Sequence, residues 1–567
     1  MKTCGSGRHV PIVWAVALWA AAAAPAAAQA PREQRPRASK PVTTAEARWE
    51  VTGQHGAVVA GGQEAVEAGL AALRAGGNAA DAAATTLLAL SVTDANQFCF
   101  GGEVPILVYD AGRQVVEVLC GQGAAPRLAT PEYFRGKGGI PGSGPESATV
   151  PAALDACLTL LARYGTRSFE TAVGPTLAIL DRGEFPWHAD LARTIRRLIE
   201  AERAGGGDRV RGLRLAADYF YRGPIAWEID AWARENGALL RYSDLATHVT
   251  RVEEPMTATY RGLTVCKCGP WTQGPYLLQA LKLLEGYDLA ALGHNRPQTI
   301  HLTVEALKLA LADRDVHLGD PHFSNIPLRE MLSDAYAAVR RALIDPQQAS
   351  LVLRPGDPRQ GLALLAAPPM PPGPPGAVQD TTTCLVADGA GNVVAATPSG
   401  WSGALAGKTG VWLGSRLQSF NLLEGSPNLL APGKRPRITL TPTIVLRGGK
   451  PEIAVSVAGG DGQDQVTLQL LLGVIDFGLS PAAAVTAPRL ETKHFISSFR
   501  QVPPELGVVR INAGVGEGVI KELAARGHKV TVAKPPIWHP SLLTIEGPGG
   551  MIRAAGDPQA GRHAAAY

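Results

Sequence analysis

The sequence predicts an α/β protein in which stacked β-sheets are covered by helices. Three observations lead to this prediction. Short β-branched runs lie near both ends of the 567-residue chain, helix-period patterns fill its middle, and a hairpin pattern follows a Pro- and Gly-rich stretch at residues 368–376. A chain of this length exceeds what one hydrophobic core usually supports, so we expect two domains or one large layered domain.

The first 28 residues have the pattern of a signal peptide. Lys2 and Arg8 precede an apolar run at residues 12–25, and Ala26–Ala28 offer small residues for cleavage. The apolar run is shorter than the roughly 20 residues that a membrane span needs, which makes an uncleaved anchor the weaker alternative. We therefore expect a periplasmic or secreted protein without a stable membrane span.

Helix patterns account for most of the chain up to residue 350. Residues 62–74 and 79–90 are expected as the first two helices, with Asn78 capping the second, and 104–109 and 115–119 as a hairpin. Further helices are expected at residues 151–164, 169–182, 187–202, 225–236, 275–284, 299–312 and 328–344. The prolines between residues 356 and 380 indicate a linker without regular structure.

The chain becomes strand-rich again at Thr381. Residues 382–386 and 393–397 are expected as a hairpin around a turn at 388–392. Later strands are expected at residues 444–446, 453–457, 508–512 and 529–532, and helices at 464–476 and 516–526. Helices thus lie between and outside two groups of strands, which favours a layered arrangement.

A threonine stands where the linker meets the hairpin. If the chain were cut before Thr381, this residue would carry a free α-amine with a reference pKa of about 7.7–8.0. Such an amine can activate its own hydroxyl as a nucleophile. The alternative is that Thr381–Thr383 are ordinary β-branched strand residues.

The composition excludes several other classes of protein. With 46% hydrophobic residues, 18% charged residues and a net charge of +4, the chain is globular and too weakly basic to indicate a nucleic-acid partner. Cys266 and Cys268 have neither a second pair nor a histidine at ligand spacing, so we expect no metal site. No cofactor is expected either.

Several stretches resemble the gamma-glutamyltransferase family. The runs "GLAALRAGGNAADAAATTLLAL" at residues 69–90, "ADRDVHLGDP" at 312–321 and "GKRPRITLTPTIV" at 433–445 are similar to its signatures, and the 381–397 hairpin resembles its nucleophile strand. The resemblance spans nearly the whole chain after residue 28. It implies the αββα sandwich of N-terminal-nucleophile hydrolases and a proenzyme that cuts itself before Thr381. The products would be a large subunit, residues 29–380, and a small subunit, residues 381–567.

The resemblance also implies catalytic roles. Thr381 would first attack the Asp380 carbonyl and later an amide substrate, forming an acyl-enzyme that water or an acceptor amine resolves. Ser399 falls where the family has a threonine that supports the nucleophile, although it also fits a polar turn residue. Gly459 and Gly460 match the pair whose backbone N–H groups form the oxyanion hole, although they also fit a plain tight turn.

The chain departs from the family where the glutathione-acting members bind their substrate. Gln122 replaces an arginine that holds the substrate carboxylate, and Gln418 or Ser419 replaces an acidic residue that holds its amine. Thr439 stands at a serine position, and Trp401 replaces an asparagine. These changes predict altered acyl specificity. Two alternatives stay open: an ordinary gamma-glutamyltransferase that acts on glutathione, and a non-catalytic relative with a binding or structural role.

Overall fold

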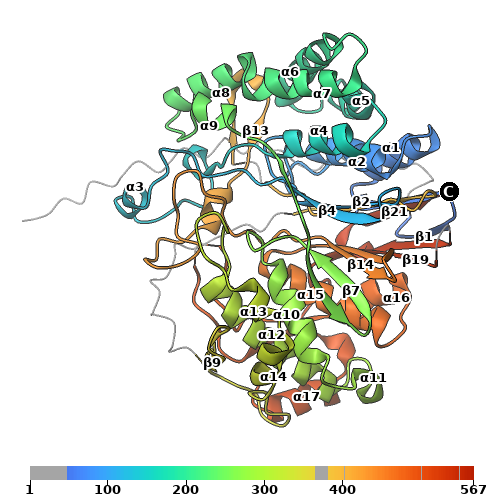
Figure 1. Cartoon of the computed structure of the whole chain (residues 1–567), viewed down its shortest axis with the longest axis vertical. Coiled ribbons are helices and arrows are strands. Elements are labelled where there is room, and N and C mark those ends of the chain that lie inside the picture. Colours follow the sequence, from blue (N-terminus) through green and yellow to red (C-terminus); the bar gives the residue numbers. More distant parts are fainter. Residues whose placement is uncertain (1–47, 364–380, 401–402, 500, 548–549) are drawn as a thin grey trace, which may run out of the picture.

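The computed structural model describes residues 48–363, 381–400, 403–499, 501–547 and 550–567. Two seven-stranded sheets lie face to face between two layers of helices (Figure 1). This four-layer arrangement confirms the predicted αββα sandwich. Within the described residues, no helix is both long enough and apolar enough to cross a membrane.

The first sheet is antiparallel and has β10 near its centre. Its order is β21 (Arg562–Ala566), β2 (Gly56–Gly61), β10 (Cys384–Asp388), β11 (Val393–Ala396), β3 (Ile106–Asp110), β4 (Val115–Cys120) and β5 (Arg251–Glu253). The predicted hairpin is confirmed as β10 and β11, whose register pairs Cys384 with Ala396. Strand β10 begins two residues later than predicted, but Thr382 N still donates to Pro398 O at 2.9 Å. Thr381 therefore lies just before a central strand.

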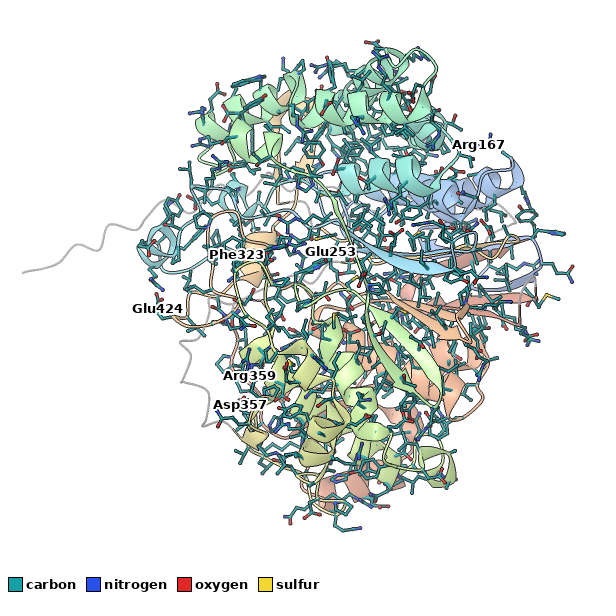
Figure 2. All side chains as sticks on the ribbon, in the orientation of Figure 1. Arg167, Glu253, Phe323, Asp357, Arg359 and Glu424 are labelled. Carbon is teal, nitrogen blue, oxygen red and sulfur yellow. The ribbon has the colours of Figure 1, made fainter. Side chains whose placement is uncertain are left out.

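The second sheet is also antiparallel and covers one face of the first. Its order is β1 (Glu50–Gly53), β20 (Ile552–Gly556), β19 (His539–Ile545), β15 (Lys450–Ala458), β14 (Thr443–Arg447), β7 (Leu263–Lys267) and β6 (Met256–Tyr260). Side chains of both sheets fill the space between the layers (Figure 2). Leu385 and Ala387 of β10 point into this inter-sheet core, whereas Cys384 and Val386 face the helices. Because both faces of β10 are covered, its first four residues, Cys384–Ala387, are all apolar.

Helices cover the outer face of each sheet (Figure 1). On the first sheet lie α1 (Gln63–Arg74), α2 (Ala79–Thr93) and α4 (Ala153–Tyr164), and outside them lie α5 (Phe169–Leu180), α6 (Pro186–Arg203), α7 (Arg209–Tyr221) and α8 (Pro224–Glu235). On the second lie α10 (Gly274–Leu284), α12 (Pro297–His317), α14 (Asp334–Arg341), α15 (Gln463–Ile475) and α16 (Pro481–Thr486), with α17 (Glu517–Ala525) beside the small sheet β16 (Leu490–Thr492), β17 (Val508–Asn512) and β18 (Lys529–Ala533). Every residue of α2 is buried, and its alanines allow close contact with neighbouring helices. Asn78 caps α2 as predicted.

Short elements complete the chain and correct some predictions. They are α3 (Pro131–Arg135), α9 (Tyr242–Ala246), α11 (Leu289–Leu292), α13 (Leu328–Met331), β8 (Gly356–Asp357), β9 (Leu362–Ala363), β12 (Ala404–Leu405) and β13 (Trp412–Leu413). The helix predicted at 328–344 is wrong as one element, because Ser333 caps a new helix, α14. The prediction of an irregular linker is wrong for residues 356–363, which form the β8–β9 ladder, because Asp313 Oδ1 accepts from Gly356 N at 2.7 Å. Its remainder, 364–380, lies outside the described residues.

A buried ion pair joins the second sheet to α15. Lys267 Nζ donates to Asp464 Oδ1, Thr441 O and Thr443 Oγ1, each at 2.8 Å, and both charged side chains are fully buried. Burial raises the pKa of Asp464 to about 6, although the nearby lysine opposes the increase. Removing either partner would leave an uncompensated charge in the core and would destabilise the fold.

Replacing Lys267 by methionine should lower the free energy of unfolding by about 3–5 kcal/mol, because it leaves an unpaired buried carboxylate. Burial raises the folded-state pKa of Asp464, and the loss of Lys267, which lowers that pKa, raises it further. The penalty is therefore full above the folded-state pKa of the variant and falls as pH drops towards the unfolded-state pKa. Chemical denaturation at pH 8 and pH 5 measures both effects. The double change Lys267→Met with Asp464→Leu is the control and should recover most of the loss; equal losses in the two variants would contradict the explanation.

Candidate active site

Thr381 is buried at the start of the β10–β11 hairpin, and the hairpin brings it beside Ser399. Thr381 Oγ1 lies 3.4 Å from Ser399 Oγ, and its backbone nitrogen donates to Gln97 Oε1 at 3.1 Å. Both hydroxyl residues are at most 3% exposed. Two of the residues that the sequence singled out thus meet, in the arrangement that a hydroxyl nucleophile and its supporting hydroxyl require.

Ser399 is held by a buried ion pair that the sequence did not reveal. Arg416 Nη2 donates to Ser399 Oγ at 2.6 Å, and Arg416 Nε donates to Glu103 Oε1 at 2.6 Å. The backbones of Ser399 and Glu103 also exchange two hydrogen bonds, at 2.9 and 3.0 Å. Because a guanidinium has no acceptor, the Ser399 oxygen must accept from it, which fixes the hydroxyl next to Thr381. The sequence offered one signal for this ion pair, namely Arg416 within residues 412–420, all of which are buried.

Gly459 and Gly460 form the turn between β15 and α15. Gly459 has φ 151° and Gly460 has φ 54°. A Cβ on Gly459 would lie 2.4 Å from the ring of Trp538, so this position excludes larger residues. The turn therefore has the tight, side-chain-free backbone that an oxyanion hole requires.

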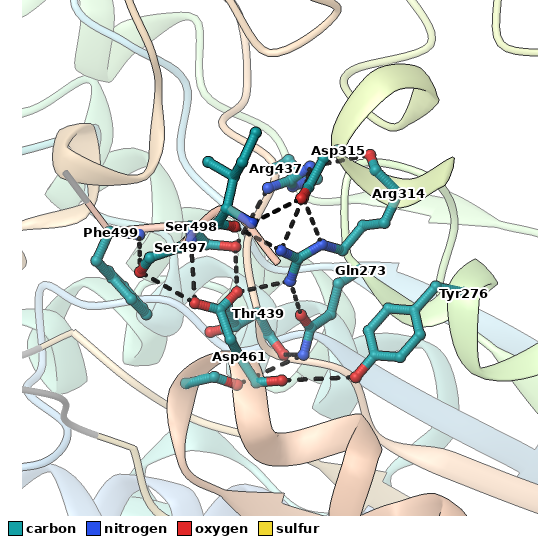
Figure 3. Close-up of polar contacts among 12 residues, drawn as sticks. Gln273, Tyr276, Arg314, Asp315, Arg437, Thr439, Asp461, Ser497, Ser498 and Phe499 are labelled. Carbon is teal, nitrogen blue, oxygen red and sulfur yellow. Dashed lines mark hydrogen bonds and ion pairs between the residues drawn. The ribbon is translucent and has the colours of Figure 1, made fainter. Parts of the chain in front are cut away.

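Asp461, the residue after this turn, belongs to a polar network that holds the turn in place (Figure 3). Arg314 Nη1 donates to Asp461 Oδ1 at 2.6 Å, and Ser498 N donates to Asp461 Oδ2 at 3.0 Å. Gln273 Nε2 lies 3.4 Å from Gly460 O and 3.3 Å from Thr439 O. Burial alone would raise the pKa of Asp461, but the Arg314 charge and the Ser498 hydrogen bonds lower it. An ionised Asp461 thus anchors the turn.

Gln463 connects Thr381 to this network. Its amide satisfies both ends when Nε2 donates to the carbonyl oxygens of Thr439 and Val457, each at 3.0 Å. The amide oxygen then lies 3.4 Å from Thr381 Oγ1. The two carbonyl oxygens thus hold the Gln463 amide nitrogen, and the amide oxygen faces the Thr381 hydroxyl.

Replacing Gln463 by leucine should lower kcat about tenfold with little change in KM, because one hydrogen bond to the nucleophile is lost. Initial rates on an acyl anilide measure the effect. Gln469→Leu, on the same helix but bonded to the backbone of Gln465 and Leu490, is the matched control and should keep kcat. A similar fall in both variants would show a general packing defect instead.

The residues predicted to bind substrate are buried and have unused polar atoms. Four side-chain atoms lack a hydrogen-bond partner among the described residues: Gln122 Oε1, Gln418 Oε1, Ser419 Oγ and Thr439 Oγ1. Thr439 joins Thr381 through Gln463, whereas Gln122 lies on the wall of a cavity of about 190 Å³. Trp401 lies outside the described residues. Buried polar atoms of this kind are normally satisfied, so each of the four is a candidate contact for a hydrogen-bonding ligand.

Comparison with known proteins identifies the family. A family model described as Gamma-glutamyltranspeptidase matches residues 65–210 and 190–567. The chain belongs to the gamma-glutamyltranspeptidase family. This confirms the resemblance inferred from the sequence, and with it a self-processing hydrolase or acyltransferase of the N-terminal-nucleophile type.

Relatives of the gamma-glutamyltranspeptidase family differ in their named activities. The acylase ACY 1 proenzyme of Pseudomonas sp. (strain SE83) is 31% identical, over 89% of this chain and 92% of its own. The glutathione hydrolase proenzyme of Pseudomonas sp. (strain A14) is 30% identical, over 78% and 83%. The cephalosporin acylase structure from Bacillus halodurans has a TM-score of 0.77 and 27% identity, over 93% and 98%. The solved structure of LmbA2991HD has a TM-score of 0.82 and 35% identity, over 92% of this chain and 100% of its own.

Among the side chains described, no group of three or more His, Cys, Asp or Glu residues is arranged to hold a metal ion.

Proposed function

We propose that the protein is an exported, self-cleaving amidohydrolase or acyltransferase in which Thr381 is the nucleophile. The observation that carries the proposal is the position of the Thr381 hydroxyl, 3.4 Å from Ser399 Oγ at the start of β10. The relatives named proenzymes support a maturation step. The signal-peptide pattern in the first 28 residues supports export.

The first reaction is cleavage of the chain itself. Thr381 Oγ1 attacks the carbonyl carbon of Asp380, the peptide C–N bond breaks, and the hydroxyl proton moves to the departing nitrogen. Water then hydrolyses the new ester and releases the Asp380 carboxylate. The products are the large subunit, residues 29–380, and the small subunit, residues 381–567, whose first residue carries a free α-amine.

The second reaction uses that amine. It takes the proton of the Thr381 hydroxyl, whose oxygen attacks the substrate amide, and Gly459 and Gly460 offer backbone N–H groups to the developing oxyanion. The amine then gives the proton to the leaving nitrogen, leaving an acyl-enzyme. Water or an acceptor amine attacks the acyl group and restores the free hydroxyl.

The acyl group is expected to differ from the glutamyl group. Gln122, Gln418, Ser419 and Thr439 are neutral, so they offer hydrogen bonds but no ion pairs to a zwitterionic head group. The acylase relatives support an altered acyl specificity for this site. Ordinary glutathione hydrolysis is the alternative, supported by the glutathione hydrolase relatives. A non-catalytic role is disfavoured by the hydroxyl pair and the glycine turn.

Denaturing electrophoresis with N-terminal sequencing tests the proposal. Purified protein should give two fragments, the smaller starting Thr-Thr-Thr-Cys-Leu. The larger should start near Gln29 when the protein is exported. A single uncut band would reject the proposed enzyme. A smaller fragment that starts at another residue would assign the nucleophile to that residue instead of Thr381. A panel of γ-glutamyl, glutaryl and neutral acyl anilides then identifies the acyl group.

A further inference from the structure

Arg562 is a buried cation beside the nucleophile. It is 5% exposed, at the start of β21, and its Nη2 donates to Thr381 O at 3.4 Å. Its Nε has no hydrogen-bond partner in the part of the chain that the structure describes. A guanidinium that is withdrawn from water in this way is costly unless an anion compensates its charge.

The neighbouring carboxylates do not supply that anion. Asp557 also acts on Arg562 through its charge, but its ion pair is with Arg489. Asp94 acts on Arg562 only through its charge, without an ion pair in the described part of the chain, and its Oδ2 has no hydrogen-bond partner. His539, which touches Arg562 Nη2 at 3.5 Å, has its pKa lowered to about 3 by burial and by the arginine charge. Within the described residues, the close contacts of the Arg562 guanidinium are therefore the neutral Thr381 carbonyl and the His539 ring, and no carboxylate lies within ion-pair distance of it.

Arg562 also lines a cavity of about 290 Å³. The cavity wall includes Asp94, Gln97, His539 and His563. Gln97 accepts from the Thr381 backbone nitrogen, which becomes the α-amine after cleavage. The cavity thus lies on the amine side of the nucleophile.

The strand order separates this cavity from the acyl side. Arg562 is on β21 and the cavity also includes Gly62 at the end of β2, both on one side of β10. Ser399 and Gln122 follow β11 and β4, on the other side of β10. In the proposed reaction the α-amine protonates the leaving nitrogen, so the amine half of the substrate must lie next to that amine.

We infer that this cavity binds the amine half of the substrate and that Arg562 selects leaving amines that carry a carboxylate. The inference rests on the proposed function and adds the chemical class of the leaving group. A buried arginine beside the departing nitrogen supplies the donors and the charge that a carboxylate needs. Asp94 partly offsets that charge and so limits how strongly the cavity binds an anion.

Two amides with the same acyl group test the inference. One releases 4-aminobenzoate and the other 4-aminobenzamide, and the acyl group is the best one from the anilide panel. The unmodified enzyme should hydrolyse the 4-aminobenzoate amide with at least about tenfold higher kcat/KM, which is the size of effect expected from one charge-assisted hydrogen bond. Arg562→Gln should bring the ratio to about one. Arg553→Gln, an exposed arginine on β20, is the matched control and should keep the ratio.

Equal rates for the two amides in the unmodified enzyme would overturn the inference, as would an unchanged ratio in Arg562→Gln. If Arg562→Gln does not fold or cut, Asp94→Asn decides: removing that negative charge should raise the ratio, and a lower ratio overturns the inference. Free 4-aminobenzoate should also inhibit hydrolysis of a neutral anilide more strongly than 4-aminobenzamide does. An uncut chain that hydrolyses neither amide would reject the proposed function itself, whereas a cut enzyme without preference rejects only the inference.

Discussion

Replacing Thr381 by alanine should give one uncut chain that hydrolyses no acyl anilide. Both proposed reactions need the hydroxyl of this residue, and turnover also needs the α-amine that the cut creates. Removal of a nucleophile of this kind commonly lowers kcat by on the order of 10⁴-fold or more. Denaturing electrophoresis and initial rates measure the two effects. Thr381→Ser should cut slowly, because it keeps a hydroxyl.

Thr382→Ala is the matched control for that experiment. Thr382 is buried next to the nucleophile, and its Oγ1 has no hydrogen-bond partner among the residues that the structure describes. Its backbone nitrogen donates to Pro398 O in either form. This variant should therefore cut and turn over substrate at nearly the normal rate. A Thr381→Ala chain that still divides into two fragments would place the nucleophile elsewhere.

The second expected result is a poor rate on γ-glutamyl-p-nitroanilide. Loss of one buried charged partner from a matched site commonly costs about 2–5 kcal/mol, and each 1.4 kcal/mol is roughly tenfold in rate. With Gln122 and Ser419 both neutral, kcat/KM should be at least about a hundredfold below that of the best acyl anilide without an α-amine. Parallel assays on the two substrates measure the difference.

The double change Gln122→Arg with Ser419→Asp should raise glutamyl activity, because it restores both charges. Each single change should do less, since it leaves one half of the head group unpaired. Gln347→Arg, at an exposed position, is the control for added positive charge. If the unmodified protein already hydrolyses γ-glutamyl-p-nitroanilide as fast as neutral acyl anilides, the specificity argument is wrong and ordinary gamma-glutamyl transfer replaces it.

The sequence predicted the elements whose signals are local. The β10–β11 hairpin follows from its alternation and its turn, and the α2 cap follows from Asn78. Helix α7 was missed, because Arg209, Arg211 and Arg214 obscure the buried stripe that contains Leu213 and Phe220. Strand β21, with the sequence "RHAAA", carries almost no β-branched signal, and its place depends on pairing with β2 far along the chain.

The candidate site was predictable only in part for the same reason. Thr381, Ser399 and the two glycines lie in motifs that can be read from short segments. Arg416 and Glu103 are 313 residues apart, and nothing local indicates that they meet at Ser399. The role of Gln463 likewise depends on how the turn before α15 folds against Thr439.

The strand order has a consequence for the unfolding of the mature protein. A cut before Thr381 would leave β2 and β3 on one fragment and β21, β10 and β11 on the other, so three ladders of the first sheet would join different chains. The β1–β20 and β14–β7 ladders of the second sheet would do the same. Separating the two fragments would break both sheets at once. The fragments should therefore migrate together in native electrophoresis until the protein unfolds. Refolding would then require two chains to meet, and heat denaturation of the cut protein should be irreversible, with a midpoint that depends on the scan rate.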